Sequence, residues 1–312
     1  MAGERGELSC SSCKRPQEEV AQPLKRCAKC QNVLYCSKEC QRRDWSSHKR
    51  VCFSKADQEA AVADNYVLEV HLRQGDIEDP AIWRTLSCPA IATFEQLHRA
   101  LQVAFGWATT HTYDFKVRDP DYEAEDEDEE DMAAMIQRIT ATYHRSQQSH
   151  TAPRQNLLRI IAKPQGRMAG FGPVDSMHSG MRSHPRTPEK LSDKVKLYEV
   201  FEDTRYRDNE LEYEYDFGDC WTHEVAVTGR TQHSEHFVCT GGEGHPCAED
   251  AGGVHGWIEL VAAYKAVRPT EEQREKRKWF ETLCSNRDQG GLAGERVKQW
   301  DKGLVNRLLA RL

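Results

Sequence analysis

Eight residues near the start of the chain have the side chains and the spacing of metal ligands. They form four pairs: Cys10 and Cys13, Cys27 and Cys30, Cys36 and Cys40, and His48 and Cys52. A Cys-x2-Cys pair turns both sulfurs toward one ion, and a spacing of four residues places both ligands on one face of a helix, one turn apart. Eight ligands of this kind are enough for two tetrahedral Zn²⁺ sites.

The segment that carries these ligands has too few apolar residues to build a core, so the metal must replace it. Four protein ligands at each ion leave no open position, which favours structural over catalytic zinc. The first residues, Met1-Ala-Gly-Glu-Arg, contain no apolar stretch typical of a secretory signal. We therefore expect an intracellular protein, cytoplasmic or nuclear or both, in which the thiols are reduced and disulfides are disfavoured.

A second set of polar residues lies farther along the chain, beside predicted turns and around one predicted helix. The set comprises His98, His111, Asp216, Asp219, His223, Glu249 and Asp250. Imidazoles and carboxylates brought together in this way could bind a metal or do acid–base work. In the other interpretation, the aspartates cap turns and the histidines are core residues with satisfied hydrogen bonds. The sequence leaves both interpretations open.

Alternating patterns predict several strands. In residues 66–73, Leu68, Val70 and Leu72 face one way and polar residues face the other, as expected for a half-buried strand. Similar patterns predict strands over residues 82–88, 211–217 and 223–228.

Helical patterns lie between and after these strands. Apolar residues recur at helical spacing after Thr93, a predicted N-cap, and Gly106 is expected to end that helix. Further helices are predicted near residues 257–267, 271–283 and 304–312. Because the elements show no regular βαβ rhythm, we expect an α+β domain with an antiparallel or mixed sheet.

The chain has 312 residues and a formal charge of −7, but this charge is local. Ten acidic residues and no basic one lie between Asp119 and Asp131, whereas Arg138 to Lys190 contains nine basic residues and two acidic ones. Such runs repel their own charges and resist burial. We predict that residues 119–193 form a disordered insertion. A mean hydropathy of −0.78 and the lack of a long apolar run argue against a membrane-spanning segment.

The first 52 residues resemble a MYND-type zinc finger, above all in Leu34-Tyr-Cys-Ser-Lys-Glu-Cys-Gln-Arg-Arg-Asp-Trp-Ser-Ser-His-Lys-Arg-Val-Cys52. The resemblance covers residues 10–52 and implies a cross-brace arrangement with interleaved ligands. Cys10, Cys13, Cys36 and Cys40 would hold one Zn²⁺, and Cys27, Cys30, His48 and Cys52 the other. The family is typically a protein-interaction module for short proline-containing peptides, and its groove residues match Gln41 and Trp45. In the other interpretation, Trp45 covers the zinc core.

The rest of the chain resembles the plasmid pRiA-four-b ORF-three-like family. The matching motifs include Phe105-Gly-Trp-Ala-Thr-Thr-His111 and Tyr213-Glu-Tyr-Asp-Phe-Gly-Asp-Cys-Trp-Thr-His223. This resemblance covers residues 66–118 and 194–312, on either side of the expected insertion. It implies an α+β fold and no established activity.

Three functions follow from these observations. The favoured one is a non-enzymatic adaptor whose finger binds proline-containing peptides of partner proteins. The second is a metal-dependent hydrolase or other enzyme that uses His223, Asp219 and Glu249, with Asp250 as a further candidate. The third is a nucleic-acid-associated regulator that acts through the basic run. The chain contains no Gly-rich phosphate loop, nucleophile elbow or His-Glu-x-x-His motif, which argues against the enzymes that depend on them.

Overall fold

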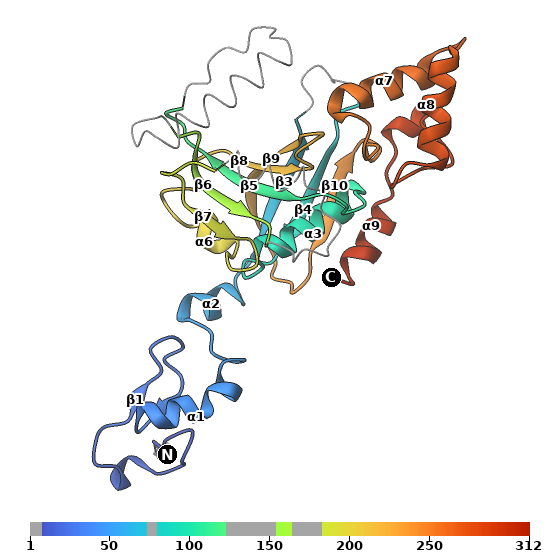
Figure 1. Cartoon of the computed structure of the whole chain (residues 1–312). Coiled ribbons are helices and arrows are strands. Elements are labelled where there is room, and N and C mark those ends of the chain that lie inside the picture. The colour runs from blue at the N-terminus through green and yellow to red at the C-terminus, as the bar shows by residue number, and fades with distance from the viewer. Residues whose placement is uncertain (1–7, 74–79, 123–153, 164–182) are drawn as a thin grey trace. The chain divides into compact units, whose positions relative to one another are not determined.

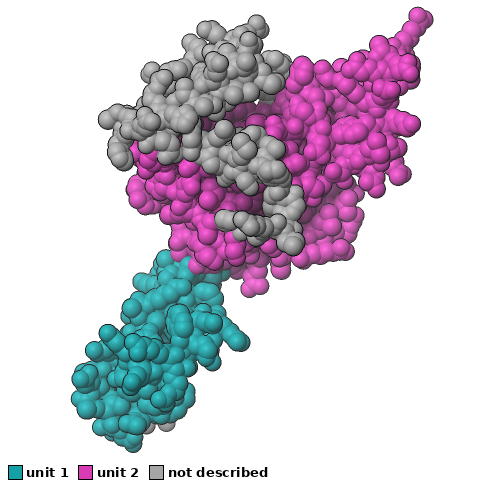
Figure 2. All heavy atoms as spheres, in the orientation of Figure 1, with its two compact units in different colours: residues 1–63 teal, residues 64–312 magenta. Residues whose placement is uncertain are grey.

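A computed structural model shows two compact units, Met1–Ala63 and Asp64–Leu312 (Figures 1 and 2). The structure describes residues 8–73, 80–122, 154–163 and 183–312. None of the helices in these ranges is long and apolar enough to cross a membrane.

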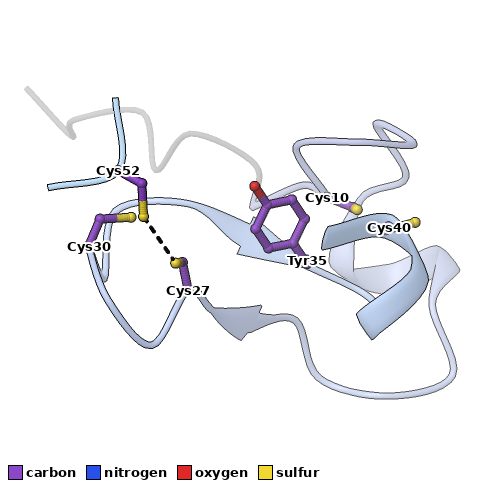
Figure 3. Close-up of a cluster of buried hydrophobic side chains, with 6 residues drawn as sticks. All are labelled: Cys10, Cys27, Cys30, Tyr35, Cys40 and Cys52. Carbon is purple, nitrogen blue, oxygen red and sulfur yellow. Dashed lines mark hydrogen bonds between the residues drawn. The ribbon is translucent and has the colours of Figure 1, made fainter. Parts of the chain in front are cut away.

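The first unit contains little regular structure. Its elements are the 3-10 helix η1 (Gln17–Glu19), strands β1 (Lys25–Arg26) and β2 (Leu34–Tyr35), and helices α1 (Lys38–His48) and α2 (Lys55–Ala60). The hydroxyl of Ser37 accepts a hydrogen bond from the backbone N–H of Cys40 at 3.2 Å and so caps α1. The buried cluster of this unit consists of five cysteines and one tyrosine (Figure 3). Its members are Cys10, Cys27, Cys30, Tyr35, Cys40 and Cys52.

The second unit is built on one eight-stranded sheet. The strand order is β10-β4-β3-β9-β8-β5-β6-β7, and every neighbouring pair is antiparallel except β6 and β7. The strands are β3 (Asn65–Leu72), β4 (Trp83–Cys88), β5 (Tyr113–Arg118), β6 (Asn156–Ile161), β7 (Glu189–Leu191), β8 (Leu211–Tyr215), β9 (Trp221–Thr231) and β10 (Val238–Glu243). The expected α+β fold with a mixed sheet is confirmed.

Helices complete this unit. Among the described residues they are α3 (Phe94–Phe105), α6 (Tyr198–Phe201), α7 (Gly253–Lys265), α8 (Glu271–Thr282) and α9 (Lys302–Leu309), with the 3-10 helix η2 (Gly294–Lys298). Helix α3 packs on the central strands: the ring of Phe94 lies 5.0 Å from that of Phe115 on β5, and Phe105 lies 4.7 Å from His223 on β9. Helix α9 is tied to β10 by two hydrogen bonds between Asn306 and the backbone of Cys239.

The structure corrects the extent of the expected insertion. Residues 119–193 contain β6 and β7, which are two strands of the sheet. Strand β6 can enter the sheet although it carries the charged residue Arg159, because this side chain pairs with carboxylates on both neighbouring strands. Its Nε donates to Asp114 on β5 at 2.6 Å, and its Nη1 donates to Glu189 on β7 at 2.9 Å. Most of the acidic and basic runs, residues 123–153 and 164–182, lie outside the described residues.

The pair of Arg159 and Asp114 yields a stability prediction. Both residues are almost completely buried. Replacing Asp114→Asn removes the closer and more deeply buried of the two carboxylates that compensate Arg159, and should reduce the free energy of unfolding of the second unit by about 3 kcal/mol. Urea denaturation followed by tryptophan fluorescence measures this unit, since six of the seven tryptophans belong to it.

An exposed ion pair on α3 provides the control. Arg99 and Glu95 lie 3.1 Å apart with more than a third of each side chain exposed. Arg99→Met should change the free energy of unfolding by no more than about 0.5 kcal/mol. Equal effects of the two substitutions would contradict the structural role assigned to Asp114.

Candidate metal centres

The first group of ligands joins the start of the chain to the start of α1. It contains Cys10, Cys13, Cys36 and Cys40, whose sulfur atoms all lie within 4.8 Å of one another. The sulfurs of Cys13 and Cys36 are 3.6 Å apart, and those of Cys36 and Cys40 are 3.5 Å apart. A tetrahedral zinc with Zn–S bonds of about 2.3 Å places its sulfurs about 3.8 Å apart. The group therefore fits one Zn²⁺.

The second group interleaves with the first along the chain. It contains Cys27, Cys30, His48 and Cys52. The sulfurs of Cys27 and Cys52 lie 3.6 Å apart, and the Nε2 atom of His48 lies 3.7 Å from the sulfur of Cys30. The eight expected ligands thus form the two expected sets, which fit two Zn²⁺ ions.

Hydrogen bonds favour the thiolate form of the first cysteine in each Cys-x2-Cys pair. Burial alone would raise the pKa of Cys10 and of Cys27, but hydrogen bonds outweigh it and lower both values to about 6. The largest of these come from the backbone of Cys13 and Cys36 at Cys10, and from the backbone of Cys30 and the side chain of His48 at Cys27. The thiolate is the form that binds metal, so these contacts favour the ligand state.

Tyr35 links the second zinc site to α1. Its ring meets that of His48 edge-on at 5.8 Å, and its hydroxyl donates to Asp44 at 2.6 Å. Burial, followed by this hydrogen bond to a carboxylate, raises the pKa of Tyr35 and keeps it neutral.

The enzyme candidates of the second unit do not form one site. Among the described residues, the three groups whose ligand atoms can share an ion exclude His223, Asp219 and Glu249. His223 is fully buried, with Nδ1 3.1 Å from the carbonyl oxygen of Trp221, and burial lowers its pKa to about 4. Asp219 accepts a hydrogen bond from the N–H of Gly252 at 3.1 Å. These two residues have the structural roles of a core histidine and a turn cap.

Glu249 has a structural role as well. Its buried carboxylate accepts hydrogen bonds from the backbone N–H of Ala108 and from the hydroxyls of Thr110 and Tyr215. It therefore fixes the loop that follows α3. His98 is also a core residue: its Nδ1 lies 2.8 Å from the hydroxyl of Tyr213, and burial lowers its pKa to about 3.

A different subset of the predicted polar residues comes together. His111, Asp216 and Asp250 form the third group whose ligand atoms lie within 4.8 Å of one another. The sequence identified these residues among seven, but gave no signal that singled them out. Tyr215 and Thr110, which position the loop of His111, escaped sequence analysis because nothing in the local pattern marks a hydroxyl as the partner of a distant carboxylate.

Family comparisons agree with both units. The model of the MYND finger family matches residues 9–52. The model of the plasmid pRiA4b ORF-3-like protein family matches residues 64–288. The chain belongs to the plasmid pRiA4b ORF-3-like protein family. It carries a MYND finger, a zinc-binding protein-interaction module, ahead of the domain that defines this family.

Individual relatives cover different shares of the chain. The uncharacterized protein y4hQ of Sinorhizobium fredii is 24% identical over 60% of this chain and 68% of its own length. Dauer abnormal formation protein 25 and SET domain-containing protein 14, both of Caenorhabditis elegans, are 39% and 40% identical over 22% and 17% of this chain. This chain spans only 16% and 11% of those two relatives.

Similarity extends to a solved structure. The protein of unknown function MM3350 from Methanosarcina mazei Go1 is 21% identical, with a TM-score of 0.47, and the match covers 78% of this chain and 98% of that chain.

Zinc ligation in the MYND finger yields a second prediction. Cys40→Ser removes one ligand, and we expect the zinc content to fall from two ions per chain to one or none. Because structural zinc supplies about 10–16 kcal/mol of apparent binding free energy in such modules, the finger should lose its amide protection. The unfolding transition of the pRiA4b ORF-3-like domain should be unchanged. Zinc analysis measures the metal content, and hydrogen exchange measures the amide protection of the finger and of the second unit.

The control is Cys220→Ser, which changes an exposed cysteine outside both zinc groups. This variant should retain two zinc ions and a protected finger. A Cys40→Ser protein with full zinc content would show that the first group is not a zinc site.

Proposed function

We propose that the MYND finger docks short proline-containing peptides of partner proteins, and that this docking makes the protein an adaptor. The single observation that carries the proposal is that Trp45 on α1 contacts a zinc ligand and is also exposed to solvent. Its side chain is held against the second zinc site, with the ring 5.9 Å from that of His48, and yet it is 45% exposed. It therefore both covers the ligand and offers an open aromatic surface.

Gln41 lies one helical turn before Trp45, so both residues share one face of α1. The Nε2 atom of Gln41 lies 3.9 Å from the sulfur of Cys27, which orients the amide. A glutamine amide has a second N–H and a carbonyl oxygen to offer to a peptide backbone. An exposed indole beside an oriented amide suits an extended proline-rich segment, which presents a stiff apolar surface and free carbonyl groups.

The other two functions have less support. The three residues of the enzyme hypothesis do not share a site, as described above. The nucleic-acid hypothesis depends on the basic run, most of which lies outside the described residues.

The adaptor proposal predicts the effect of Trp45→Ala. An exposed aromatic anchor at a peptide interface contributes about 2 kcal/mol or more, so we expect at least about a 30-fold loss of affinity for bound proline-containing peptides. The measurement selects such peptides from a library with the zinc-loaded wild-type chain and then determines their Kd by calorimetry.

Phe53→Ala is the matched control. Phe53 is an aromatic residue of the same unit, beyond the end of α1, and it is 49% exposed. The variant should bind with unchanged affinity, and both variants should retain two zinc ions. A zinc-loaded Trp45→Ala protein that keeps wild-type affinity would contradict the proposed groove.

A further inference from the structure

The group formed by His111, Asp216 and Asp250 lies where three loops of the second unit meet. His111 belongs to the loop after α3, Asp216 directly follows β8, and Asp250 precedes α7. The Nε2 atom of His111 lies 3.0 Å from Oδ1 of Asp250 and 3.5 Å from Oδ2 of Asp216. We propose that these three side chains form a third metal site, which binds a divalent first-row transition cation such as Mn²⁺.

The distances suit such an ion. Ligands about 2.1 Å from a metal lie about 3.0 Å apart along an octahedral edge and about 3.4 Å apart along a tetrahedral edge. The two separations at His111, 3.0 and 3.5 Å, lie close to the distances between neighbouring ligands of one such ion. One imidazole and two carboxylates favour Mn²⁺, Fe²⁺ or Zn²⁺, and the absence of thiolate ligands sets this group apart from the two zinc sites of the finger.

Contacts behind the ligands hold them in place. The hydroxyl of Tyr215 accepts hydrogen bonds from the backbone N–H groups of Thr110 and His111 at 3.0 and 3.3 Å, and it donates to the buried carboxylate of Glu249. The Oδ1 atom of Asp216 accepts from the N–H of Gly218 at 2.9 Å, which leaves Oδ2 toward His111. Such outer contacts orient metal ligands and are costly to remove.

The charge around the group is incompletely compensated. Asp216, Asp219, Glu249 and Asp250 all belong to the segments that meet here, and within the described ranges no lysine or arginine pairs with them. Even a protonated imidazole leaves this region negative, and a divalent cation would provide the missing charge.

The site would be open to solvent ligands. The side chain of Asp250 is 51% exposed and that of His111 is 25% exposed, whereas Asp216 is 6% exposed. Three protein ligands leave at least one coordination position for water or for an oxygen atom of a bound anion. This arrangement is unlike the closed tetrads of the finger.

The test uses the full chain loaded with two equivalents of Zn²⁺, which fill the thiolate sites, and Mn²⁺ as the probe. Bound and free Mn²⁺ are separated by their electron paramagnetic resonance signals, and we expect one bound ion per chain. His111→Ala and Asp250→Asn should each weaken Mn²⁺ binding at least about tenfold. Asn at position 250 tolerates the positive φ of +60° found there, so the fold should persist. Zinc content should remain two ions per chain, because thiolate sites prefer Zn²⁺ to Mn²⁺.

The matched control is His71→Ala. His71 on β3 also contacts a carboxylate, with Nε2 2.6 Å from Glu69, but this pair belongs to none of the three groups. The variant should bind Mn²⁺ with wild-type affinity. The proposal is overturned if the wild-type chain gives no stoichiometric Mn²⁺ signal, if folded His111→Ala and Asp250→Asn proteins bind as the wild type does, or if His71→Ala loses binding equally. The adaptor proposal is unaffected by any of these outcomes, since no readout here involves the peptide.

Discussion

Compensation of charge removed from water is the constraint on which both units depend. An ionised group in a low-dielectric interior is costly unless opposite charge or hydrogen bonds replace its hydration. In the finger, the buried cluster is made largely of cysteine sulfur, so two Zn²⁺ ions both neutralise the thiolates and replace an apolar core. Without the ions, the same side chains would gather several like charges in a small volume. The metal is therefore a condition of this unit's fold.

In the second unit, hydrogen bonds to backbone carbonyl groups compensate a buried charge without a metal. Arg84 on β4 is fully buried, and its guanidinium donates to the carbonyl oxygens of Ala104 and Gly244 at 2.8 and 2.9 Å and also to those of Trp83 and Glu243. The group stacks over Trp300 at 4.5 Å. Burial lowers its pKa to about 10, which leaves it protonated at neutral pH. One cation thus joins the end of α3 to the turn after β10. Gly242 is needed for this contact, because a Cβ atom there would lie 2.7 Å from Cδ of Arg84.

Sequence patterns predicted the elements that depend on local interactions. Helix α3 begins after Thr93 and ends before Gly106 as expected, because a capping box with Gln96 and a left-handed glycine are local signals. Strand β8 was expected from alternation, but the glutamates of its polar face are also buried. Glu212 and Glu214 pair with Lys116 from β5, a partner about a hundred residues away. Strands β6 and β7 were missed for the same reason, since their pairing is set by distant contacts.

The candidate sites show the same difference between local signals and contacts made by distant residues. All eight zinc ligands were found because separations of three and four residues mark each ligand pair within one short segment, and the family resemblance then divided the pairs between two ions. Of the polar residues of the second unit, the sequence could not distinguish His223, a core histidine, from His111, because the difference arises from folding rather than spacing. His223 lies on β9 beneath α3, whereas the loop of His111 is held near Asp216 and Asp250 by a hydroxyl and a carboxylate from elsewhere. A closed thiolate site completes its own coordination and serves structure. The proposed site of the second unit differs in both respects: it gathers hard ligands from three distant segments and leaves access for solvent ligands.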